Sequence, residues 1–408
     1  MSANFYLSSH ANSHLHPRAT LLTARHEDLR LATEQELAWI EIWSASAMQK
    51  LCKRLGLRQQ VHATAIVFFR RFYLRNSYCE TDPALVAAAC CYVAAKAEET
   101  PVHVKSAASE ARIVFSDMSH PTATATFDPT KLAEMEFYLL EELDFHLVVY
   151  HPYRALVQLC GRDGGAAAGG EEGRKERGRM LEMDDTALQM AWYIINDTFR
   201  SSLCLIHPPH LIAIAAIYLA FALHPPPSAA SAILPPAVPS PEDLSSASAS
   251  ASPSKSAGAI ATRTRRASQD ATAGTDGLAS AASSAAAKAA SSSTTPGGKT
   301  DPITFLASLQ VDTSLVLEIV QEIVSLYELW AGLEATATAS PAAAALGFGG
   351  ASAGKTGGMG AGGAAAGNKT DERVVLVLKR MQEARMRELR EERGRMAAAA
   401  AAGQGRRT

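Results

Sequence analysis

The segment Gly349-x-x-x-x-Gly354-Lys355-Thr356 has the spacing of a phosphate-binding loop, which would hold a nucleotide. Such a loop needs a buried strand before it and a helix after it, because these elements aim its backbone N–H groups at the phosphates. Here the match is surrounded on both sides by Ala- and Gly-rich sequence. We therefore interpret the match as a result of composition and expect no nucleotide site.

Other residues that could support catalysis or metal binding are scattered. None of the 6 cysteines belongs to a Cys-x-x-Cys pair, so a zinc ribbon is not expected. The 12 histidines do not form a cluster spaced to bind a metal, with residues that could orient them as ligands. His14-x-His16 stands in a terminal segment, where we expect solvated side chains. No nucleophile and base are suggested by the sequence. We predict a protein that is not an enzyme and has no cofactor or metal.

The charge balance and hydropathy exclude two classes of partner. The chain carries 39 Lys+Arg and 41 Asp+Glu, whereas a dedicated nucleic-acid-binding protein usually has a basic excess. The longest apolar run, residues 211–223, is too short to span a bilayer. We expect neither nucleic acid nor membrane as a direct partner. Three serines in low-complexity sequence are candidate phosphorylation sites: Ser268, which follows two arginines, and Ser240 and Ser252, which precede prolines.

Helical periodicity and capping residues predict the elements that organise the first half of the chain. Thr33-x-x-Glu36 is a capping box that begins a helix over residues 33–60, and a second helix is expected over 59–77. A third helix starts at Pro83 after Asp82 and is apolar on all sides until Lys96. A helix without a polar face must be surrounded by other helices. A further helix is predicted over 129–144, and no alternating strand pattern appears.

The apolar helix has a second copy. Residues 208–223 again begin with proline and are again apolar throughout, and Leu85 to Ala94 match Leu211 to Ala220 at a constant offset (211 − 85 = 126). At the position equivalent to Lys96, the second copy has Ala222. The repeat predicts an all-α protein with two helical bundles. The amphipathic stretch 302–330 should return to complete the second bundle, because nothing else would cover its apolar face.

The motifs within these bundles resemble the cyclin family. Tyr92-Val-Ala-Ala-Lys96-x-Glu98-Glu99 resembles the end of the third cyclin-box helix, and 132–145 resembles the fifth. The further motifs that resemble cyclin C, in particular, are Asn4-Phe5-x-x-Ser-Ser-His10, Leu57-Arg-Gln-Gln-Val61, Val149-Tyr-His-Pro-Tyr153, Ile195-Asn-Asp-Thr198 and Pro208-Pro209. This resemblance implies a tandem cyclin fold of two five-helix bundles with an N-terminal helical segment. The low-complexity insertions have no counterpart in compact relatives, and their composition predicts that they are disordered.

The resemblance and the composition together divide the chain into segments. These are an N-terminal kinase-docking segment (1–32), a first cyclin box (33–150), a second cyclin box (151–224 and 302–332), a disordered insertion (225–301), a disordered Ala/Gly linker (333–370), a charged helix (371–395) and a disordered tail (396–408). Residues 162–180 are expected to form a surface insertion. The charged helix is expected to be solvated, because its arginines and glutamates are spaced to pair within the helix.

In function, the resemblance implies a nuclear regulatory subunit that activates the cyclin-dependent kinase of the Mediator kinase module and contacts other subunits of that module. The residues that would bind the kinase are Lys96, Glu136, Leu85, Glu99, Phe5 and Tyr6. Two alternatives remain. A DNA-binding cyclin-fold factor resembling transcription factor IIB would need a zinc ribbon and basic faces, which are not evident. A cell-cycle cyclin would carry a substrate-docking groove on its first helix, where this chain reads Leu37-Ala-Trp-Ile-Glu-Ile-Trp43.

Overall fold

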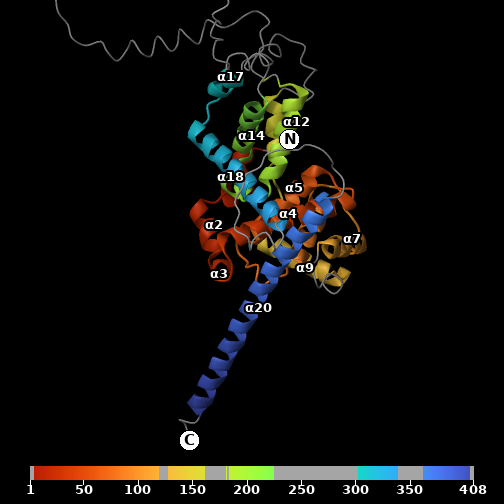
Figure 1. Cartoon of the computed structure of the whole chain (residues 1–408), viewed down its shortest axis with the longest axis vertical. Helices are drawn as coiled ribbons and strands as arrows, with labels where there is room; N and C mark the ends of the chain where they lie inside the picture. Colours follow the sequence, from red (N-terminus) through yellow and green to blue (C-terminus); the bar gives the residue numbers. More distant parts are fainter. Residues whose placement is uncertain are drawn as a thin grey trace, which may run out of the picture. The chain divides into compact units, whose positions relative to one another are not determined.

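The computed structural model describes residues 4–118, 127–160, 181, 183–224, 302–338 and 362–404. Within these ranges every regular element is a helix (Figure 1), which confirms the all-α prediction. No helix in the described part is long and apolar enough to cross a membrane. The predicted insertions at 162–180 and 225–301, the phosphate-loop match and Ser240, Ser252 and Ser268 lie outside the described residues.

Five helices form the first bundle: α4 (Glu34–Arg54), α5 (Gln59–Phe72), α6 (Pro83–Ala97), α7 (Val104–Asp117) and α9 (Pro129–Glu142). Their starts follow local sequence. The capping box of α4 is complete, since the Thr33 N–H donates to the Glu36 carboxylate at 2.9 Å while the Glu36 N–H donates to the Thr33 hydroxyl at 3.2 Å. Asp82 accepts from the Ala84 N–H and starts α6 with Pro83 in its first turn.

Helix α6 is the centre of the first bundle. It packs against α4, α5, α7 and α9, and its residues from Val86 to Ala95 are all buried. Its alanines allow the neighbouring helices to approach closely. The prediction that an apolar helix must be surrounded is therefore confirmed, and α6 can serve as a rigid support for the side chains at its ends.

The second bundle repeats this arrangement around α14. Its helices are α10 (Pro152–Leu159), α12 (Asp185–Thr198), the short α13 (Leu203–Ile206), α14 (Pro209–Leu223), α17 (Pro302–Ser308) and α18 (Thr313–Thr338). Helix α14 contacts α10, α12, α17 and α18, so the stretch after the long insertion does return to the bundle as predicted. That stretch is not one continuous helix, because Asp312 accepts a hydrogen bond from the Ser314 N–H and begins α18 anew.

Short helices form the N-terminal segment: the 3₁₀ helix η1 (Phe5–Leu7), α1 (Ser9–Ser13), α2 (Arg18–Ala24) and α3 (His26–Leu29). Asp28 fixes the end of this segment to the first bundle. Its buried carboxylate accepts from the Ser77 hydroxyl at 2.6 Å and from the Tyr78 N–H at 3.1 Å, and it pairs with Arg25 at 3.0 Å. The residues before the first bundle are therefore held against it.

The C-terminal helix departs from the sequence prediction. Helix α20 spans Gly362–Gln404, beyond the predicted 371–395, and α18 runs to Thr338, into the predicted linker. The expectation of a solvated helix is wrong for its first half, which packs on α4 and α18 and buries Val374, Leu378 and Met381. Its arginines also pair outside the helix: Arg380 lies 2.8 Å from Glu36. The later residues 390–396 are exposed, and in Figure 1 this end of α20 extends past the other labelled helices.

Candidate functional site

A charged pair lies where the end of α6 meets the middle of α9. The Lys96 ammonium donates to Glu136 Oε1 at 2.6 Å, and the two side chains are 41% and 14% exposed. The ammonium also lies 4.2 Å from the centroid of the Tyr92 ring, one helical turn earlier on α6. Packing of α6 against α9 brings the two ends of this pair together. The structure therefore places Lys96 and Glu136 in contact, as the resemblance implied.

The surroundings keep Lys96 charged. Its partial burial acts to lower the pKa of the ammonium, but the hydrogen bond to Glu136 and the contact with Tyr92 outweigh that effect and raise the pKa above its ordinary value. A charged and partly desolvated ammonium can donate to further acceptors, since only part of its hydrogen-bonding capacity is used by Glu136. The site can thus offer directed N–H groups to backbone carbonyls of a partner.

The other predicted residues of α6 share this side of the helix or lie just beyond its end. Leu85 precedes Lys96 by three helical turns (96 − 85 = 11 residues), which places it on the same face about 16 Å away. It is half-buried. Glu99 is exposed and has a left-handed backbone with φ of 55°. The neighbouring Glu98 turns inward, where it accepts from Gln60 at 2.7 Å and from Thr64 at 2.6 Å. Only Glu99 of this acidic pair is available to a partner.

Exposed apolar side chains on α9 and just after its end were missed by the sequence prediction. Phe137 is 73% exposed on α9, and Phe145 (69%) and Val148 (59%) follow the end of that helix. A signal was present in the sequence, because Leu132, Met135 and Leu139 form the buried stripe of α9 and Phe137 falls outside it. We define Phe137, Phe145 and Val148 as the α9 apolar patch. Exposed aromatic side chains are enriched at protein-binding surfaces, and Phe137 shares α9 with Glu136 of the charged pair.

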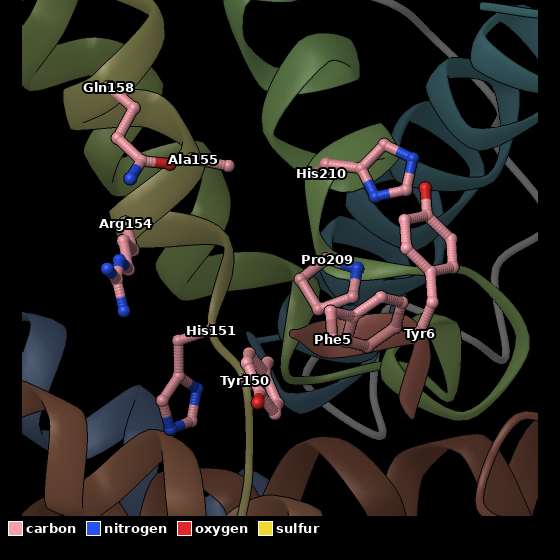
Figure 2. Close-up of a pocket in the computed structure, with 9 residues that line it drawn as sticks. All are labelled: Phe5, Tyr6, Tyr150, His151, Arg154, Ala155, Gln158, Pro209 and His210. Carbon is pink, nitrogen blue, oxygen red and sulfur yellow. The ribbon is translucent and has the colours of Figure 1, made fainter. Parts of the chain in front are cut away.

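Phe5 and Tyr6 lie at a second place, in the wall of a cavity of about 410 Å³. The centroid of the Phe5 ring lies 5.4 Å from that of Tyr150 and 6.4 Å from that of His210. The Tyr6 ring centroid lies 6.2 Å from that of His210, and Tyr6 is 66% exposed. Figure 2 shows Phe5 beside Pro209 and Tyr6 directed toward His210, with the residues of α10 on the opposite wall. Phe5 therefore anchors the N-terminal segment to the chain itself, and Tyr6 is the more exposed of the two rings.

Two buried histidines hold the N-terminal segment in this position. His10 Nδ1 accepts from the Tyr150 N–H at 3.0 Å, and His14 Nε2 lies 3.1 Å from His146 Nδ1. Burial and the nearby Arg71 guanidinium lower the pKa of both His10 and His14 to about 3. Both rings are neutral at physiological pH, as the hydrogen bond to His10 requires. The segment is a folded part of the molecule.

The second bundle does not reproduce the charged pair. The residue equivalent to Lys96 is Ala222, an exposed position at the end of α14. Although the repeats share a buried central helix that starts at proline, only the first presents a lysine at the end of that helix. The two repeats therefore differ at the point where a charged partner group would be recognised.

Comparisons with known proteins agree with this architecture. The family model described as "Cyclin, N-terminal domain" matches residues 9–148. The RNA polymerase II holoenzyme cyclin-like subunit of Mycosarcoma maydis is 34% identical over 380 residues, covering 81% of this chain and 90% of that protein. Cyclin-C of Drosophila melanogaster is 37% identical over 228 residues, covering 54% of this chain and 77% of that protein. Cyclin-C1-1 of Oryza sativa subsp. japonica is 37% identical over 225 residues, covering 55% and 78%.

Solved structures match more weakly. A chain of the CAK complex from Chaetomium thermophilum bound to ATP-gamma-S is 20% identical with a TM-score of 0.39, over 53% of this chain and 67% of that chain. The assignment therefore rests on the sequence relatives, which are matched over most of their length. The chain belongs to the cyclin C family.

Proposed function

We propose that this cyclin is the regulatory subunit of a cyclin-dependent kinase that acts in transcription by RNA polymerase II. The observation that carries the proposal is the Lys96–Glu136 pair, whose charged atoms lie 2.6 Å apart where α6 packs on α9, the helix that also carries the exposed Phe137. The family relationship supports the same function, since a relative that covers most of this chain is named an RNA polymerase II holoenzyme cyclin-like subunit.

The proposed mechanism is stabilisation of the active kinase conformation. A protein kinase is active when its αC helix presents a glutamate to the lysine that holds the ATP phosphates. A surface that binds αC in this inward position shifts the existing conformational equilibrium toward the active state. Lys96 would donate to backbone carbonyls near αC, Glu136 would orient Lys96, and Leu85 and the α9 apolar patch would pack against the helix. The cyclin contributes no reacting group in this mechanism.

The N-terminal segment would add selectivity for one kinase. Tyr6 is mostly exposed beside a cavity, and Phe5 and His10 hold it in place. An aromatic ring on a fixed support binds with little loss of conformational freedom, so it can discriminate among related kinases. We propose that the cognate kinase is that of the Mediator kinase module, that other subunits of this module bind the same cyclin, and that the complex acts in the nucleus.

The position of α20 favours this function over that of a substrate-docking cell-cycle cyclin. Helix α20 covers α4, and the Arg373 guanidinium lies 4.5 Å from the centroid of the Trp39 ring, which is itself 4% exposed. A peptide that docks on this face of α4 would have to displace α20. Among the helices that the structure describes, none covers the ends of α6 and α9 in the way that α20 covers α4.

The test is affinity purification from nuclear extract with the full chain as bait. Wild type should retain a cyclin-dependent kinase, identified by mass spectrometry, that phosphorylates a peptide from the RNA polymerase II C-terminal domain. The double variant Lys96→Ala/Glu136→Ala should lose that kinase. Arg54→Ala is the matched control, because Arg54 forms a similar exposed pair with Glu110 at 2.6 Å. Equal recovery of kinase by the double variant, or recovery of no kinase by wild type, would contradict the proposal.

A further inference from the structure

Three potential metal ligands converge where the second bundle meets the N-terminal segment. His207 follows α13, and Glu318 and Glu322 stand one turn apart on α18. One ligand atom from each residue can be chosen so that all three lie within 4.8 Å of one another. The two carboxylates share a helix face because their spacing is i,i+4. Sequence spacing does not reveal this group, since His207 lies more than a hundred residues before the two glutamates.

The imidazole of His207 points into this group of ligands, and its Nε2 atom has an unused capacity for a hydrogen bond. His207 is 6% exposed, and its Nε2 lies 3.8 Å from Glu322 Oε1, which is beyond hydrogen-bond distance. Among the residues that the structure describes, this nitrogen has no hydrogen-bond partner. Pro208 follows directly, and the His207 N–H is bound to the Leu203 carbonyl at 3.0 Å, so the backbone fixes the direction of the ring. A buried ring nitrogen without a partner is unfavourable unless a ligand satisfies it.

A cation from the chain already contacts the two carboxylates. Arg18, the first residue of α2, donates to Glu318 at 3.3 Å and to Glu322. The Arg18 side chain is 52% exposed, so it can leave the carboxylates without opening the core. The two carboxylates therefore stabilise a nearby cation, and a cation other than the Arg18 guanidinium could take that place.

We propose that His207, Glu318 and Glu322 bind a divalent transition-metal ion of the zinc type, in competition with Arg18. One imidazole nitrogen and two carboxylate oxygens are a ligand set suited to zinc and similar ions, whereas magnesium and calcium prefer oxygen ligands alone. Three protein ligands leave a fourth position for water, and Glu318 is exposed enough to admit it. Metal binding would release Arg18 and with it one attachment of the N-terminal segment to α18.

The test is calorimetric titration of the EDTA-treated full chain with zinc chloride, repeated with cobalt chloride to record the absorption of a bound ion. Wild type should bind one ion at this site. Glu322→Gln and His207→Gln should each weaken affinity at least about tenfold, because even residues outside the ligand shell can contribute that much. Arg18→Ala should increase affinity severalfold, because it removes the competing cation.

The control is His224→Gln. His224 is exposed beside a single carboxylate, with its Nε2 at 3.6 Å from Asp184, and its loss should leave the affinity unchanged. Glu322→Gln keeps the experiment informative if His207→Gln misfolds, because the Glu322 side chain is 21% exposed, against 7% for His207, and circular dichroism can verify the fold. Absence of binding by wild type, or the same affinity in wild type and Glu322→Gln, would overturn the site. An Arg18→Ala variant with unchanged affinity would overturn the competition.

Discussion

Lys96 and Glu136 are 40 residues apart in the chain, yet the lysine ammonium lies 2.6 Å from the glutamate oxygen. The pair is too exposed to contribute much to folding, since surface ion pairs typically stabilise by about 0 to 1 kcal/mol. Its orientation is nevertheless fixed by α6, α9 and the Tyr92 ring. A charged group that is held rigidly without much benefit to stability is suited to binding.

The first prediction concerns the energy of this pair in the kinase complex. Lys96→Ala and Glu136→Ala should each weaken binding of the purified kinase by about 2 to 5 kcal/mol, because the remaining charge would be buried without its partner. The double variant should lose less binding free energy than the sum of the two single losses, since both changes disrupt the same ion pair. Calorimetry measures the affinities, and the melting temperature should stay near that of wild type. Additive losses would show that the two residues bind independently.

The second prediction concerns the α9 apolar patch. Phe137→Ala should weaken kinase affinity at least about tenfold, because a buried aromatic side chain is a frequent centre of binding energy. Stability should hardly change, since Phe137 is 73% exposed in the free chain. Leu223→Ala is the control, because Leu223 is 64% exposed at the end of α14 in the other repeat. Equal losses for both variants would remove the patch from the proposed interface.

Local signals explain why much of the fold could be predicted from the sequence. The Thr33–Glu36 capping box and the Asp82–Pro83 start depend on residues within one turn, and both are present in the structure. The break before α18 was missed because the apolar period continues through Asp312, whose side-chain hydrogen bond to the Ser314 N–H ends that continuity. A helix cap of this kind competes with a periodic pattern, and the pattern alone does not show which prevails.

Contacts between distant segments explain what the sequence could not predict. The arginines of α20 have glutamates at helical spacing, so a solvated helix was a reasonable hypothesis, yet Arg380 and Arg385 pair with Glu36 and Glu80 of the first bundle. Phe5 resembled a free anchor in sequence because Tyr150, its partner, is far along the chain. The pairing of Lys96 with Glu136 came from family resemblance and not from periodicity.

The third prediction tests the docking of α20. Met381→Ala should lower the free energy of unfolding by about 2 to 5 kcal/mol, because Met381 is 0% exposed between α20 and its neighbours and its loss leaves a cavity. Removal of residues 390–408 should have little effect, since the described side chains 390–396 are exposed. Urea unfolding measures both. A Met381→Ala variant as stable as wild type would show that α20 docks only weakly.

The fourth prediction separates the roles of Phe5 and Tyr6. Tyr6→Ala should reduce affinity for the cognate kinase and leave the free cyclin unchanged, because the ring is 66% exposed. Phe5→Ala should also increase proteolysis of the N-terminal segment, since Phe5 packs on Tyr150 and His10. Calorimetry and limited proteolysis distinguish the two effects. If a chain that begins at Thr33 binds the kinase as tightly as wild type, the segment has no part in binding.

The last prediction concerns pH. Burial and Arg71 lower the folded-state pKa of His10 and of His14 to about 3, whereas the unfolded value is 6.5. Below pH 6.5 these two histidines therefore bind protons in the unfolded chain but not in the folded chain. The free energy of unfolding falls as the pH drops toward 3. Each histidine lowers the free energy of unfolding by at most about 2 kcal/mol between pH 6.5 and pH 5, because one pH unit corresponds to about 1.36 kcal/mol.

The fall in stability should be visible as a lower urea midpoint at pH 5 than at pH 7.5. His10→Gln should reduce the pH dependence by roughly one proton, because it removes one of the groups that titrate only on unfolding. The His10 ring must be neutral at Nδ1 to accept the Tyr150 N–H, so the same acidification should loosen the N-terminal segment. A wild-type midpoint that is equal at both pH values would contradict the neutral, buried state of these rings.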